Sequence, residues 1–121
     1  MIRQDTETAL MHFVFHILRN ASELEARLTI FLLVYLGFCP EHWCFVFKEE
    51  LLNGQDFFND TGERIFQIYG CGITSGSLNE AIQQVNKRGL LKIKNREEGT
   101  LVVKLNIKYL KNEVSKYRAY Q

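Results

Sequence analysis

The sequence has few prolines and few cysteines: one proline and three cysteines occur in 121 residues, and there is no low-complexity run. No linker can be recognised, so a single domain over residues 1–121 is expected. An odd number of cysteines argues against a disulfide framework and favours a reducing compartment, the cytoplasm. The start of the chain also lacks the apolar core and small-residue cleavage site of a signal peptide.

Long apolar runs and catalytic motifs are missing as well. The longest apolar run, residues 28–39, is too short to span a bilayer, so no membrane contact is expected. No glycine-rich phosphate loop, nucleophile elbow or pair of catalytic carboxylates occurs. We therefore expect a protein that is not an enzyme and that holds no cofactor.

Two groups of potential metal ligands occur. The four residues of the first group are Cys39, His42, Cys44 and Cys71, a chemically reasonable set for zinc. Their spacing differs from the usual Cys-x2-Cys knuckle and their neighbours are aromatic, which favours buried thiols over zinc. His12 and His16 share one helical face without a third ligand nearby, which favours core or interface histidines.

The net charge is only +1, but the charges are unevenly distributed. Residues 86–121 hold ten basic and three acidic residues, a balance of +7. Residues 1–85 hold five basic and eleven acidic residues, a balance of −6. The basic part favours a polyanion or an acidic protein surface as partner, and a solvated lysine-rich surface without a ligand is the alternative.

The clearest local pattern is a helix followed by a hairpin. The apolar residues of residues 78–88 recur at helical spacing: Leu78, Ala81, Ile82 and Val85. Ser77 and Glu80 have the spacing of a capping box at the start of this helix, and Gly89 suits the left-handed residue at its end. We predict an amphipathic helix over residues 78–88.

Two alternating stretches follow this helix. Their apolar positions are Leu91, Ile93, Leu101, Val103, Leu105 and Ile107. Lys92, Lys94 and Lys104 fall on the opposite face, and Gly99 supplies the positive φ of a short turn. The pattern predicts a β-hairpin over residues 90–107 with its lysines on one solvated face.

Helices are also expected in the rest of the chain. Three precede residue 53: residues 5–20, residues 23–36 with a capping box Ser22–Glu25, and residues 40–52. A short strand over residues 45–47 is the alternative within the third. A loop covers residues 56–62, and Asp60 with Glu63 would cap a short helix carrying Ile65, Phe66, Ile68 and Tyr69. A final helix from Tyr109 follows the hairpin.

The stretch from Glu63 to Ile107 resembles a winged helix-turn-helix: helix, glycine-containing turn, second helix and hairpin. The pattern Leu78-x-x-Ala81-Ile82-x-x-Val85-x-Lys87-Arg88-Gly89-Leu90 is similar to the recognition helix and following strand of the multiple-antibiotic-resistance regulators. The outer helices resemble those that build the dimer of that family. The resemblance implies an α+β winged helix-turn-helix fold, mostly helical, with a C-terminal two-stranded wing and flanking helices.

The motif also occurs in winged-helix subunits of SMC-type and ABC-type ATPase complexes, where the fold often joins proteins. The chain departs from the regulator pattern at the wing tip, where Glu97 and Glu98 stand in place of a basic motif. The helix over residues 78–88 also lacks arginine until Arg88.

The resemblance predicts a non-catalytic protein that binds DNA through its recognition helix and basic wing, as a dimer or within a complex. Asn79 and Gln83 would face base edges, because amide side chains pair with adenine, and the basic residues would contact phosphates. The predicted nucleic-acid-binding residues are Asn79, Gln83, Lys87, Arg88, Lys92, Lys94, Arg96 and Lys104. The alternative function is an accessory subunit of an SMC/ABC-type ATPase–effector assembly that uses the winged helix for protein contacts.

The helix expected over residues 5–20 is apolar on nearly every side. Successive residues of a helix turn by about 100°, so such a helix has more than one face to bury. The predicted interface residues are Phe13, Val14, Ile17 and Leu18. We expect this helix to bury its second face against another polypeptide, identical or not.

Overall fold

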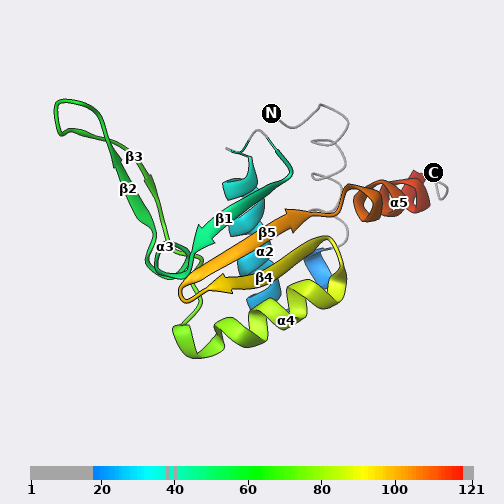
Figure 1. Cartoon of the computed structure of the whole chain (residues 1–121). Coiled ribbons are helices and arrows are strands. Elements are labelled where there is room, and N and C mark those ends of the chain that lie inside the picture. The colour runs from blue at the N-terminus through cyan, green and yellow to red at the C-terminus, as the bar shows by residue number, and fades with distance from the viewer. Residues whose placement is uncertain (1–17, 38, 40, 119–121) are drawn as a thin grey trace.

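The computed structural model describes residues 18–37, 39 and 41–118 (Figure 1). Its helices and strands are, in chain order, η2 (Leu18–Asn20, a 3-10 turn), α2 (Glu23–Leu36), β1 (Trp43–Phe47), α3 (Lys48–Asn53), β2 (Gln55–Phe58), β3 (Arg64–Ile68), η3 (Ser75–Ser77), α4 (Leu78–Arg88), β4 (Leu91–Glu97), β5 (Thr100–Leu105) and α5 (Ile107–Arg118). Most of the helix predicted over residues 5–20 lies outside the described residues. In this part of the chain no helix has the length and apolar character needed to cross a membrane.

A three-stranded antiparallel sheet lies at the centre, in the order β1-β5-β4. Phe45 and Lys94 flank Val102 of the central strand in register. A separate antiparallel pair, β2-β3, extends away from this sheet on the side opposite α5 (Figure 1). Helices combined with antiparallel sheets place the chain in the α+β class.

One face of the three-stranded sheet is buried against helices α2 and α4. Period-two alternation brings every second side chain of each strand to this inner face. The buried residues from the strands are Cys44, Val46, Leu91, Ile93, Leu101, Val103 and Leu105. Those from the helices include Leu28, Leu32 and Leu36 of α2, Leu78, Ala81 and Val85 of α4, and Leu110 of α5. This single cluster leaves the outer face of the sheet to solvent.

Helix α2 has the predicted bounds, and its start is capped as predicted. The Ser22 hydroxyl accepts a hydrogen bond from the backbone N–H of Glu25 at 3.2 Å. Glu25 does not complete the capping box by bonding back to the start of the helix, because its buried carboxylate faces Arg88 of α4.

Helix α4 and the hairpin β4–β5 also confirm the local patterns, with two corrections. Gly89 ends α4 at φ 97°, and Gly99 turns the hairpin at φ 81°. Ser77 makes no side-chain cap to α4, because it belongs to the 3-10 turn η3 that leads into the helix. Ile107 lies in α5 and not in the hairpin, since the Asn106 carboxamide accepts from the Tyr109 N–H and starts that helix.

The largest error of the sequence interpretation concerns residues 55–69. The short helix predicted after Asp60 is instead strand β3. This strand pairs with β2, most of which lies in the segment predicted as a loop. Between residues 40 and 53 the strand alternative is confirmed, because β1 precedes a short α3. Pairing between distant segments decided both outcomes, and the local cap signals carry no information about it.

We call the β2–β3 hairpin, residues 55–68, the arm. The chain leaves α3 at Gly54 and returns beside it, since the Cys71 N–H donates to the Leu51 carbonyl at 2.9 Å. At the tip the Asn59 side chain accepts from the backbone N–H groups of Thr61 and Glu63. The arm therefore lies between α3 and α4 in the chain. Its second strand, β3, takes the place of the helix that was predicted to precede the turn.

Candidate functional site

Helix α4 presents a polar stripe to solvent. Its apolar residues Leu78, Ala81 and Val85 face the core, so the opposite side of the helix is exposed. Asn79, Gln83 and Lys87 follow one another at four-residue intervals on that side, and all three are exposed. The structure thus brings three of the predicted nucleic-acid-binding residues onto one continuous line.

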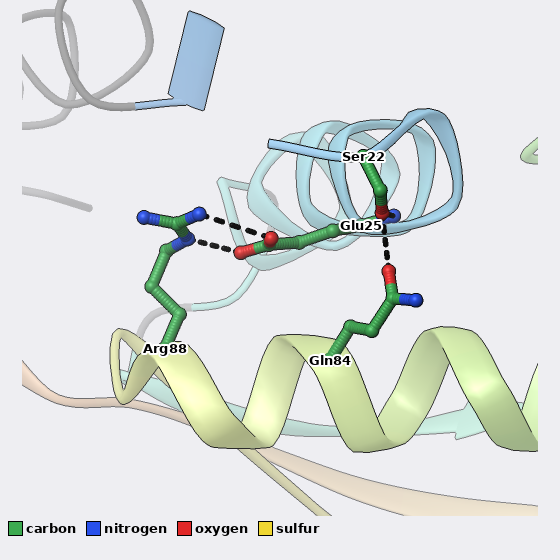
Figure 2. Close-up of polar contacts among 4 residues, drawn as sticks. All are labelled: Ser22, Glu25, Gln84 and Arg88. Carbon is green, nitrogen blue, oxygen red and sulfur yellow. Dashed lines mark hydrogen bonds and ion pairs between the residues drawn. The ribbon is translucent and has the colours of Figure 1, made fainter. Parts of the chain in front are cut away.

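Arg88 does not belong to this stripe. Two nitrogens of its guanidinium group donate to the Glu25 carboxylate of α2: Nε donates to Oε2, and Nη2 donates to Oε1 at 3.0 Å (Figure 2). These hydrogen bonds raise the pKa of Arg88 above its ordinary value. Arg88 therefore forms a partly buried ion pair that joins two helices, and its predicted contact with a phosphate stays a prediction.

Two further side chains of α4 hold the helix in place. The Ser22 hydroxyl donates to the Gln84 Oε1, a second link between α2 and α4 (Figure 2). On the other side of α4, the Asn86 amide donates to the Ile93 carbonyl at 3.0 Å and its oxygen accepts from the Ile93 N–H at 2.7 Å. Asn86 thereby covers backbone groups on the free edge of β4, which is one of the two edge strands of the sheet.

The lysines of the hairpin lie on a different surface. Lys92, Lys94 and Lys104 are exposed and point to the outer face of the sheet, as predicted, away from the face that packs on α4. Within residues 18–37, 39 and 41–118, none of these three makes an ion pair. The predicted site is therefore divided between a polar stripe on α4, which packs on the inner side of the sheet, and a basic face on the outer side of the sheet.

Arg96 has an aromatic neighbour. Its guanidinium carbon lies 4.5 Å from the centre of the Phe45 ring, across the central strand. A register shift between Asn95 and Glu97 accompanies this position. Arg96 is therefore part of the outer sheet face, and its acidic neighbours Glu97 and Glu98 stay exposed at the tip.

No protein-family model, curated protein or solved structure matches this chain. The winged-helix interpretation accordingly rests on the chain's own residues and on the order of its elements.

The sequence interpretation overlooked two exposed apolar surfaces. The first is the aromatic row Trp43, Phe45 and Phe47 on β1, for which the alternation of aromatic with small residues was the available signal. The second is the arm, which forms an apolar groove of about 390 Å³ against α2. The groove is lined by Tyr35, Cys39, Phe57, Ile65, Phe66 and Ile68.

The N-terminal interface prediction is only marginally covered. Phe13, Val14 and Ile17 lie outside the described residues, as do His12 and His16. Leu18 is described and is buried in the core cluster.

The cysteines form no recognisable metal site in the described part of the chain, where no three His, Cys, Asp or Glu side chains gather. Cys44 and Cys71 are buried free thiols, Cys39 is half-buried, and His42 is exposed.

Burial makes the inner thiols poor nucleophiles. It raises the pKa of Cys44 to about 12, with a further contribution from the nearby Cys39 thiol, and it also raises the pKa of Cys71. Since the thiolate is the reactive species, we expect iodoacetamide at about pH 8 to leave Cys44 and Cys71 unlabelled in the folded protein. Peptide mapping by mass spectrometry measures this. Labelling of Cys44 ahead of Cys39 would contradict the expected burial.

The same shifts predict a stability change at alkaline pH. The folded-state pKa of Cys44 exceeds its ordinary value of 9.0, so the unfolded chain releases this proton first as the pH rises. Tyr35 acts in the same direction, because burial and its hydrogen bond to Glu50 raise its pKa from 10.0 to about 12. Stability from these groups is complete below about pH 9 and is lost between pH 9 and 12.

Proposed function

We propose that this chain is a non-catalytic winged-helix protein that binds duplex DNA through α4. Helix α4 runs directly into the antiparallel hairpin β4–β5, and β1 completes a sheet in the order β1-β5-β4. Helix α2 supports α4 from behind through the Glu25–Arg88 pair. These features support a recognition helix held rigidly beside a wing, with cytoplasmic DNA as the partner.

The observation that carries the proposal is the α4 stripe. Asn79 and Gln83 are amides that can bond bidentately to adenine in the major groove, and Lys87 provides a phosphate contact one turn further on. Their positions are rigid, because the buried face of α4, the Glu25–Arg88 pair and the Asn86 contacts to β4 fix the rotation of the helix. A fixed polar stripe is what direct base readout requires.

The test compares variants of the stripe on a randomised duplex library. The wild-type chain should enrich a sequence motif. Asn79→Ala together with Gln83→Ala should relax that motif, since a bidentate amide–adenine pair contributes about 1–3 kcal/mol of discrimination. Lys87→Ala should weaken all sequences alike and lower the slope of log affinity against log salt by about 0.9.

The matched control is Lys111→Ala, which removes an exposed lysine from α5. It should leave both the motif and the affinity unchanged. If the wild-type chain enriches no motif, or if Lys111→Ala acts as strongly as Lys87→Ala, the α4 stripe is not a base-reading surface.

A second candidate function is favoured by the arm. Phe58 and Ile65 of the arm expose 60% and 65% of their surfaces, and Tyr69, directly after the arm, exposes 75%. The groove beside them is almost entirely apolar. Exposed apolar patches of this kind mark protein contacts. The chain would then be an accessory subunit of an SMC/ABC-type ATPase–effector assembly, docked through the arm. A chain that needs a co-expressed neighbour to stay in solution, and that does not bind duplex DNA, would favour this function.

A further inference from the structure

The outer face of the three-stranded sheet combines aromatic and basic side chains in separate strands. Strand β1 contributes Trp43, Phe45 and Phe47, which expose 40%, 40% and 54% of their surfaces. The basic residues of this face come from the other two strands: Lys92, Lys94 and Arg96 of β4 and Lys104 of β5. An aromatic edge thus runs alongside a basic one.

The strand register places these groups in rows. Trp43 lies opposite Lys104, and Lys104 lies opposite Lys92. In the next row Phe45, Val102 and Lys94 are neighbours. Adjacent strands are about 4.8 Å apart, so Trp43 and Phe45 each have a lysine one or two strands away. Phe47 lies in the row of Thr100 and Glu97, at the end of the face without a lysine.

The aromatic rings are held in fixed orientations. Trp43 and Phe45 pack edge to face, with ring centres 5.1 Å apart and an interplanar angle of 81°. The Arg96 guanidinium lies 4.5 Å from the centre of the Phe45 ring and supports it further. Little side-chain freedom remains to be lost when a flat ligand binds, which favours binding.

Without a ligand this face is electrostatically unfavourable. Lys92 and Lys104 are directly opposed, and like charges in that position destabilise a sheet. In the part of the chain that the structure describes, no carboxylate forms an ion pair with either. A ligand that is both flat and anionic would cover the aromatic row and neutralise the lysines together.

We infer that the outer face of the sheet binds single-stranded DNA. Unpaired bases stack on Trp43, whose ring is held edge to face by Phe45, while the phosphates pair with the lysines of β4 and β5. A duplex fits poorly, because its bases are already stacked and leave no face for an aromatic ring. An apolar protein surface also fits poorly, since it would bury Lys92, Lys94 and Lys104 without counter-charges.

The choice of DNA rests on the proposed function. Strand β4 is an edge strand of the sheet and lies beside α4, joined to it by the Asn86 contacts to Ile93. A strand that separates from a duplex held on α4 would pass around the β4 edge to reach the outer face. The two surfaces together suit a junction between double-stranded and single-stranded DNA.

Trp43 provides a direct reporter, because it is the one tryptophan of the sequence. Oligothymidylate of about 12 nucleotides should quench its fluorescence on binding, and a blunt duplex should not. Measured by anisotropy of labelled oligothymidylate, Trp43→Ala should weaken binding roughly 10-fold, and Trp43→Phe should weaken it less. Replacing Lys92, Lys94 and Lys104 together by alanine should lower the salt slope by about 2.

Two controls distinguish binding at this surface from non-specific binding elsewhere on the protein. Phe58→Ala removes a similarly exposed aromatic ring from the arm, and Lys111→Ala removes a lysine from α5. Both should bind oligothymidylate like the wild type. The inference is overturned if oligothymidylate leaves Trp43 fluorescence unchanged, if Phe58→Ala weakens binding as much as Trp43→Ala, or if oligouridylate binds more tightly.

A third variant distinguishes this inference from the proposed function. Asn79→Ala, Gln83→Ala and Lys87→Ala combined should lose duplex binding and keep oligothymidylate binding. Retained quenching without any duplex binding would remove the proposed function alone. Normal duplex binding without quenching would remove the outer-face inference alone. Trp43 is 40% exposed, so Trp43→Phe should remain folded, which thermal unfolding monitored by circular dichroism measures.

Discussion

Replacement of Arg88 by alanine should lower the free energy of unfolding by about 3 kcal/mol, because it leaves a buried carboxylate without its partner. Glu25 is 6% exposed and accepts from two nitrogens of Arg88. Removing one member of such a pair costs more than the pair contributes, since the remaining charge stays desolvated. Urea denaturation followed by circular dichroism measures the effect.

The double variant Glu25→Met/Arg88→Met completes the experiment. With both charges replaced by apolar side chains, most of the loss should be recovered. Arg64→Ala is the control, since it breaks an exposed ion pair with Asp56 and should change stability by less than about 0.5 kcal/mol. Equal losses for Arg88→Ala and Arg64→Ala would show that the helix pair α2–α4 does not depend on this contact.

Replacement of Gly54 by alanine should have a comparable effect, about 2–4 kcal/mol, from backbone strain and overpacking combined. Gly54 has φ 83° at the base of the arm. A Cβ there would press into the Ile68 carbonyl oxygen and lie 2.9 Å from the Gly70 nitrogen. Backbone atoms cannot swing aside as a side chain does, so the two strands of the arm would have to separate at their base.

Gly62 is the matched control for Gly54. It lies in the same hairpin with φ 85°, but an added Cβ meets nothing within 4 Å. Gly62→Ala should therefore show only the left-handed backbone cost of about 1–2 kcal/mol. The difference between the two variants in urea denaturation isolates the close approach at the base of the arm. If the two losses are equal, the strands are not as tightly joined as the structure has them.

The sequence predicted those elements whose signals are local. Helix α2 has its predicted bounds because Ser22 caps it and its apolar residues repeat within the helix. The hairpin β4–β5 follows from strict alternation and from Gly99. In both segments each residue reports on its near neighbours, so a single stretch of sequence is sufficient.

The arm could not be predicted in this way. Asp60 and Glu63 gave a plausible cap for a helix over residues 63–69, yet Arg64–Ile68 pairs with Gln55–Phe58. Strand pairing depends on a partner segment that periodicity does not identify. The same limitation left the strand over residues 45–47 as an alternative only, because β1 pairs with β5 more than fifty residues later.

The sequence predicted which residues of the candidate site are exposed better than it predicted how they are arranged in space. Asn79, Gln83 and Lys87 are exposed on one line, as helical spacing requires. The ion pair of Arg88 could not be predicted, because its partner Glu25 is 63 positions away in the sequence. The lysines of the hairpin are exposed as predicted, but only the packing of α4 against the inner face shows that they belong to a second surface.

The most direct test of the account is the binding of the wild-type chain to a duplex library as salt is raised from about 50 to about 200 mM. The proposed function predicts retention at low salt, enrichment of a sequence motif, and a salt slope that falls by about 0.9 in Lys87→Ala. Absence of retention at the lowest salt, or retention that is unchanged when Asn79, Gln83 and Lys87 are all replaced by alanine, would contradict it.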